Sequence, residues 1–226
     1  MTECDSGSHD ERVRDGADRA ARPSVPVALV AGAALFNEGY FRAARTVWET
    51  AAGSTGDENN DAERLLRGLA ATAAATRRAS NGDPKAVEQA ETAVAALGGV
   101  SDAHGSTLTP VREWAERLSV DPEGPDASRA PQVRVDGDAA RFDGLSLDAA
   151  RLAAPALARA GEPGDPEALA AAADLAEAER GTGRSRFAEL LLAYLRTPES
   201  RPQVAARLAD HVAIEERKRR DVDGLF

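Results

Sequence analysis

Long alanine-rich runs are the feature that most constrains the fold of this chain. Alanine dominates the tracts from Ala70 to Ala75 and from Ala170 to Ala173, while Phe, Trp and Tyr together make up only 4% of the 226 residues. Alanine has the highest helix propensity of the amino acids and adds little side chain to a core. We therefore expect an all-α chain whose helices pack closely through small residues.

Turn signals divide the N-terminal part into segments. The polar segment 1–23 has too little apolar content to form a core, so we predict a disordered acidic tail. Pro26 begins a helix that runs to about Asn37, and the Asn-Glu-Gly turn at 37–39 precedes a second helix that ends near Ala52. In this second helix Phe41, Ala44 and Trp48 follow the helical period and predict a buried stripe.

The third predicted helix covers about residues 59–80. Its buried stripe holds Leu65, Leu66 and Leu69. Gly68 interrupts this helix at a cost of about 1 kcal/mol relative to alanine, which indicates a close approach by a neighbouring helix.

Two more helices follow in the first part of the chain. We expect Asp83 to cap the fourth, with Pro84 as its first residue, and the pair at 98–99 to end it. A fifth begins at 109–110 and carries Trp114. Residues 24–119 therefore predict an antiparallel helical bundle with tetratricopeptide-like hairpins.

A composition change predicts a second domain. Residues 120–132 are rich in Pro, Gly, Asp and Ser and are interpreted as a linker. The segment 133–226 is then a small helical domain, with helices near 147–160, 166–180, 185–195 and 202–219. Weak alternation around Asp136-Gly137 indicates a short β-hairpin at its start.

The charge pattern bears on environment and partners. The net charge is −10, with 38 Asp and Glu but only two lysines, Lys85 and Lys218. This balance is typical of adaptation to molar salt, where the Debye length of about 3 Å screens carboxylate repulsion; a GC-rich genome is the alternative explanation. The acidic balance makes a broad nucleic-acid interface unlikely by composition.

Location and cofactor chemistry are predicted from what the chain does not contain. Its single cysteine, Cys4, rules out an internal disulfide and fits a reducing interior, and the apolar stretch 25–36 is too short to span a bilayer. With no signal-peptide pattern at its start, we expect a soluble cytoplasmic protein. No phosphate-binding loop, zinc-ligand spacing or nucleophile elbow occurs, so we predict no cofactor and no metal site.

One cluster of charged residues is a candidate site. Arg45 and Glu49 lie one helical turn apart, and Arg67 and Arg78 project from the next helix. If these two helices pack antiparallel, Glu49 would meet Arg67 or Arg78. The cluster is then either an anion pocket with a carboxylate acid or base, or an ion-pair lattice on the surface, which we favour.

The C-terminal run EERKRR, residues 215–220, is the densest cationic cluster. Nucleic acid or acidic lipid is one interpretation. Cations that complement the dipole at a helix C-terminus explain the run better. The final Leu225 and Phe226 are expected to dock on their own domain or, less favoured, on a partner.

The segments ALFNEGYFRAARTVWE and ERLLRGLAATAAATRRASNGDPKAVEQAETAVAAL resemble domain-of-unknown-function family 309, especially its haloarchaeal members. The ending SRF…DVDGLF resembles a C-terminal extension of those relatives. The resemblance covers about residues 33–97 and implies a compact all-helical bundle. The positions that agree with the family pattern are Phe41, Ala44, Trp48, Glu49, Leu65, Leu66, Gly68, Leu69 and Gly82.

The departures from that pattern concern residues that titrate. Arg45-Thr46 stands where relatives carry His followed by an acid, Arg67 replaces Gln, and Arg78 replaces the later His. Arginine stays protonated near neutral pH and cannot shuttle protons. The sequence therefore favours a non-enzymatic interaction or scaffold protein that binds a protein partner or itself. The alternative is a small-anion binder or enzyme that uses Glu49 with Arg45, Arg67 and Arg78.

Overall fold

The protein is described by a computed structural model that covers residues 24–54, 61–101, 103–122, 126–181 and 185–223. The predicted tail 1–23 and the terminal Leu225 and Phe226 lie outside the described residues. Within them the predicted all-α fold is confirmed, since helices account for nearly all regular structure. The described strands form a single antiparallel pair, β1 (Arg134–Val135) and β2 (Asp138–Ala139).

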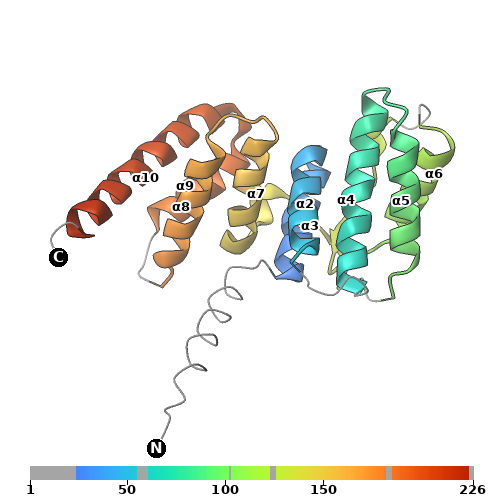
Figure 1. The fold of residues 1–226 in the computed structure, drawn as a ribbon, viewed down its shortest axis with the longest axis horizontal. Helices are drawn as coiled ribbons and strands as arrows, with labels where there is room; N and C mark the ends of the chain where they lie inside the picture. Colours follow the sequence, from blue (N-terminus) through green and yellow to red (C-terminus); the bar gives the residue numbers. More distant parts are fainter. Residues whose placement is uncertain (1–23, 55–60, 102, 123–125, 182–184, 224–226) are drawn as a thin grey trace, which may run out of the picture.

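The helices form an elongated array (Figure 1). From one end to the other, the array begins with α6, α5 and α4, continues with α3, α2 and α7, and ends with α8, α9 and α10. The first five helices are α2 (Val25–Asn37), α3 (Phe41–Ala52), α4 (Asp61–Ser80), α5 (Ala86–Gly98) and α6 (Thr109–Val120). The later helices are α7 (Leu147–Arg159), α8 (Pro166–Ala178), α9 (Arg186–Arg196) and α10 (Arg201–Asp223). Short 3₁₀ helices η1 (Ala127–Arg129), η2 (Phe142–Gly144) and η3 (Pro198–Ser200) lie in the connections.

Trp48 fills the contact between α2 and α3. Its side chain is fully buried, its ring centroid lies 6.1 Å from that of Phe36, and its indole packs where a side chain at Gly32 would stand. Phe36 in turn makes an edge-to-face contact with Phe41 at 5.0 Å. Phe36, Phe41 and Trp48 therefore hold two helices together.

The helices α4, α5 and α6 pack through small residues. A Cβ added to Gly68 would lie 2.5 Å from Cδ2 of Leu97, so α5 approaches α4 closely at this point, as the sequence predicts. Alanines supply most of the other contacts, including Ala71, Ala93 and Ala115, which form one small buried cluster across the three helices. Side chains this small let helix axes come near one another.

The β-hairpin is fastened to the end of α2. Asp136 and Gly137 both have positive φ, which suits the predicted two-residue hairpin turn. The Asn37 side chain donates 2.9 Å hydrogen bonds to the carbonyls of Val133 and Ala140 and accepts one from the Val133 N–H at 2.8 Å. A single amide thus joins residues about 100 positions apart in the chain.

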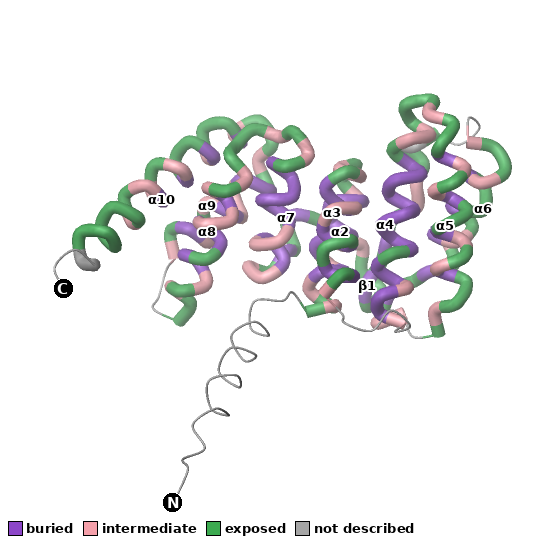
Figure 2. Tube along the Cα trace, viewed as in Figure 1, coloured by how far each residue is buried: buried purple, intermediate pink, exposed green. Residues whose placement is uncertain are grey.

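The two parts of the chain share one buried cluster. α7 packs on α2 and α3, and the cluster contains Leu35 and Trp48 from the first part with Leu157 and Leu191 from the second. Buried segments run through the array from α4 to α8 (Figure 2). The division into two domains at 120–132 stays a prediction.

Helix capping differs between two similar sequence signals. Asp165 caps α8 by accepting from the N–H groups of Glu167 and Ala168, and Pro166 is the first helical residue. The expectation that Asp83 and Pro84 begin α5 was wrong, because the helix starts at Ala86. Asp83 instead accepts from the Lys85 N–H and from Arg78, and so closes the turn before the helix.

Candidate interaction groove

The candidate residues of α3 form an ordinary surface pair. Arg45 Nε donates to Glu49 Oε1 at 2.8 Å, and both side chains are about half exposed. This is the intrahelical pair expected from their four-residue spacing. Among the described residues no other ion pair involves Glu49.

The two candidate arginines on α4, Arg67 and Arg78, have separate partners. Arg67 pairs with Glu63 at 2.5 Å, and Arg78 pairs with Asp83 at 2.8 Å. The structure therefore brings Arg45 and Glu49 together but places Arg67 and Arg78 in other pairs. The hollows that described residues form on α6, between α3 and α7, and beside Phe142 are lined by none of these four residues.

The predicted packing positions lie inside the array. Ala44, Trp48, Leu65, Leu66 and Leu69 are fully buried. Gly68 is also buried, whereas Phe41 is partly exposed and packs on the edge of the core.

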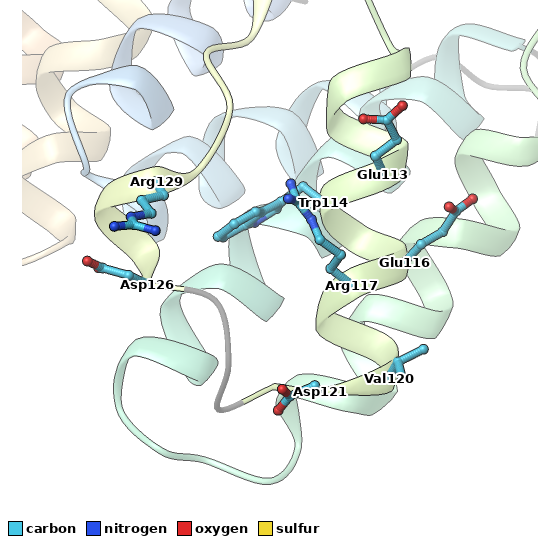
Figure 3. Close-up of a pocket in the computed structure, with 8 residues that line it drawn as sticks. All are labelled: Glu113, Trp114, Glu116, Arg117, Val120, Asp121, Asp126 and Arg129. Carbon is cyan, nitrogen blue, oxygen red and sulfur yellow. The ribbon is translucent and has the colours of Figure 1, made fainter.

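A wide groove lies on α6, at one end of the array (Figure 3). We define it by the eight residues that line it, and its volume is about 880 Å³. Six come from α6 and the residue after it, and two from the segment that contains η1: Glu113, Trp114, Glu116, Arg117, Val120, Asp121, Asp126 and Arg129. Trp114 and Arg117 point toward the segment that carries Asp126 and Arg129, while Glu113, Glu116 and Val120 lie along the opposite edge of α6 (Figure 3).

Trp114 forms the base of the groove. Its Nε1 donates to Thr76 Oγ1 at 2.9 Å, and Thr76 donates onward to the Thr72 carbonyl at 2.8 Å, so the indole is anchored to α4. The guanidinium carbon of Arg117 lies 5.3 Å from the centre of the Trp114 ring, within range of a cation–π interaction. Arg117 therefore covers an aromatic surface that is only 2% exposed.

The groove carries an excess of negative charge. Its four carboxylates outnumber its two guanidinium groups, and no described ion pair involves Glu113 or Glu116. Hydrogen bonds from the hydroxyl and the N–H of Ser128 lower the pKa of Asp126, and the nearby Arg129 charge lowers it further, so this carboxylate is ionised near neutral pH. The groove also contains Val120, whose 86% exposure is the highest of any large apolar residue described.

A smaller cavity of about 180 Å³ lies between α3 and α7. Thr46 lines it with Arg151 and Arg159 of α7. Arg151 is held by Glu177 at 2.8 Å, so this arginine already has its counter-ion. Thr46 and the arginines of this cavity offer no general acid or base near neutral pH.

Sequence reasoning missed the most buried charge in the described structure, Arg201. Its Nη1 donates to Tyr40 Oη at 2.6 Å and to Glu162 Oε2 at 2.7 Å, and its Nε donates to the Tyr194 carbonyl at 3.1 Å. Burial alone would lower the pKa of Arg201, but the hydrogen bonds from Arg201 to Tyr40 and Glu162 raise it. Arg201 follows Thr-Pro-Glu-Ser at the start of a helix, a context that resembles any exposed first turn, so no local signal marks it as buried.

Sequence reasoning also placed Trp114 on a helix without identifying the groove around it. The spacing of Trp114 and Arg117, three residues apart on a helix, was the available signal for a stacked pair. Whether Asp126 and Arg129 line the groove depends on the path of the chain after α6, which the spacing of residues in the sequence does not predict.

The described residues contain no group of three or more His, Cys, Asp and Glu side chains placed to hold a metal ion. Within the same residues, no helix combines the length and the apolar character needed to cross a bilayer.

Comparison with known proteins gives no relative. The chain matches no family model, no curated protein and no solved structure.

Proposed function

We propose that this chain is a cytoplasmic, non-enzymatic helical scaffold that binds a protein partner through the α6 groove. The observation that carries the proposal is an exposed groove of about 880 Å³ in which Glu113 and Glu116, which take part in no described ion pair, share one edge of α6 with the exposed Val120. A helix with cationic and apolar side chains has the matching chemistry.

The chemistry of the groove suits recognition more than catalysis. Glu113 and Glu116 are exposed and one turn apart on α6, where they can pair with cations of a bound helix. Val120 continues the same face one turn later and supplies an apolar contact. Protein interfaces commonly have a polar rim around an apolar core.

The alternative, an anion binder or enzyme at Glu49, Arg45, Arg67 and Arg78, is not favoured by the geometry. The four side chains occupy three separate ion pairs on two helices. An anion pocket needs guanidinium groups that converge on one space. The resemblance to domain-of-unknown-function family 309 stays a prediction, and it implies no enzymatic activity for this chain.

The test is binding of a designed peptide. A fluorescent amphipathic helix with arginines on one face and leucines beside them is titrated against the whole protein by anisotropy. We expect wild type to bind it and the variant Glu113→Gln with Glu116→Gln to bind roughly tenfold more weakly, because two charge-assisted contacts are lost.

The matched control removes two carboxylates elsewhere. Glu88 and Glu91 have the same three-residue spacing on the exposed surface of α5, outside the groove. Glu88→Gln with Glu91→Gln changes the net charge equally and should leave binding unchanged. Equal weakening by both double variants would mean that the peptide responds only to net charge, and the proposal would be abandoned.

A further inference from the structure

We propose that the groove binds the exposed C-terminal half of α10 from a second copy of this chain, so that copies associate end to end. This inference rests on the proposed function and names the partner of the same groove. It is argued from the two ends of the array: the groove has four carboxylates against two guanidinium groups, and residues 216–221 of α10 have four cations against two carboxylates.

The far end of the array is a helix without a packing partner. α10 packs on α8 and α9 in its first half, and Val212 is the last of its described residues that is buried. From residue 216 to 221 every side chain is exposed, and this half extends past the other helices (Figures 1 and 2). A few unsupported helical turns are marginally stable in water, so a packing surface would stabilise them.

This half of α10 carries cationic side chains that can pair with the carboxylates of the groove. Residues 217–220 are four consecutive cations in a chain of net charge −10. Lys218 pairs with Glu215, whereas no described ion pair involves Arg217 or Arg219. The unpaired guanidinium groups on α10 complement the unpaired carboxylates Glu113 and Glu116 on α6.

Each of the two surfaces also contains one exposed large hydrophobic residue. Val120 and Ile214 are the large hydrophobic residues that are exposed in the described structure, at 86% and 44%. Val120 belongs to the groove, and Ile214 lies one turn before Arg217 on α10. Each end thus presents one exposed aliphatic side chain, Val120 one turn after Glu116 and Ile214 one turn before Arg217.

Length and position also agree. Residues 213–221 span about 14 Å, against about 18 Å for the twelve residues of α6. Because the groove and the end of α10 lie at opposite ends of the array (Figure 1), the tail cannot reach the groove of its own copy. The contact is therefore between copies, and because it joins two different surfaces it can repeat along an open chain of molecules.

The experiment is analytical ultracentrifugation of the full chain over a concentration series, with charge-reversed variants. We expect the average mass of wild type to rise with concentration through a weak interface. The variant Glu113→Arg with Glu116→Arg and the variant Arg217→Glu with Arg219→Glu should each associate at least about tenfold more weakly, because like charges then face one another. A mixture of the two should associate again, since each basic end then meets an acidic one.

Controls match the charge changes at exposed positions outside both surfaces. Glu88→Arg with Glu91→Arg, and Arg186→Glu with Arg207→Glu, should leave the association at its wild-type strength. If a reversed variant does not fold by circular dichroism, Val120→Gln and Ile214→Gln test the same contact without charge reversal and should each weaken it.

Three results overturn the inference: wild type that stays monomeric at every concentration, reversed variants that associate as wild type does, or a mixture that does not recover. Its failure is separable from failure of the proposed function. If the designed peptide still distinguishes the Gln variant from its α5 control, the groove binds a cationic helix from another protein and only self-association is wrong.

Discussion

Arg201 Nη1 donates a 2.6 Å hydrogen bond to Tyr40 Oη, although 161 positions separate the two residues. The guanidinium carbon also lies 4.9 Å from the centre of the Tyr40 ring. Tyr40 precedes α3 and Arg201 begins α10, so this contact ties the first part of the chain to the last.

We expect Arg201→Met to destabilise the protein by about 3 to 5 kcal/mol, because it leaves the partners of a buried charge unpaired. Urea unfolding followed by circular dichroism measures the change. Arg207→Met is the matched control on the exposed side of α10 and should change the free energy of unfolding by less than about 0.5 kcal/mol. Equal effects of the two substitutions would show that the Arg201 contacts contribute nothing.

Asn37 should be the residue that couples the β-hairpin to α2. Asn37→Ala removes three side-chain hydrogen bonds, each with a net contribution of about 1 kcal/mol. Asn37→Asp should destabilise the protein as well, because a carboxylate cannot donate to the carbonyls of Val133 and Ala140. Hydrogen exchange of the Val133 N–H measures the local effect, and unchanged protection in Asn37→Ala would contradict this role.

The close approach of α4 and α5 predicts opposite effects at two helical glycines. Gly68→Ala forces a methyl group against Leu97 and should cost about 1 to 3 kcal/mol. Gly98→Ala meets no atom within 4 Å and should be neutral or stabilise by up to about 1 kcal/mol. Thermal unfolding of both variants measures the difference. A Gly68→Ala protein as stable as wild type would mean that the two helices separate at little cost.

Alkaline pH should unfold the protein partly through Tyr194. Burial raises the pKa of this phenol to about 12, with the Arg201 charge opposing the shift and Glu162 and Tyr40 adding to it. Because its pKa is higher in the folded state, the protonated Tyr194 phenol contributes its full stability below the ordinary tyrosine pKa of about 10. That contribution is lost as pH rises toward 12.

The variant Tyr194→Phe isolates this contribution. At neutral pH it should lose about 1 kcal/mol, because the hydroxyl no longer donates to the Pro163 carbonyl. Across the alkaline range wild type should then lose about 2 kcal/mol relative to the variant, so that the difference changes sign and Tyr194→Phe becomes the more stable protein. Urea titrations at a series of pH values measure it, and a constant difference between the two proteins would contradict the shift.

Much of the helical arrangement was predictable from local signals. The limits of α2, α3 and α6 agree with the turn residues around them, and Gly68 correctly indicated a close helix contact. The hairpin at Asp136-Gly137 followed from the same kind of reasoning. The prediction that Asp83 caps α5 was wrong. The Asp83 carboxylate instead accepts hydrogen bonds from the Lys85 N–H and from Arg78 of the preceding helix.

The candidate site was less predictable. The pair Arg45–Glu49 follows from helical spacing, but whether Glu49 meets Arg67 depends on the rotation of α4 against α3, which spacing does not determine. The groove on α6 needs residues from two segments, and only the first was visible as a helix with a tryptophan.

By itself, the sequence determined where most of the helices begin and end, because propensity and turn chemistry act over a few residues. Only the tertiary structure decided that Arg201 is buried against Tyr40, that Val120 and Ile214 are exposed at opposite ends, and that no described ion pair involves Glu113 or Glu116. These properties depend on which distant surfaces exclude water from one another, and that is determined by packing across the whole array.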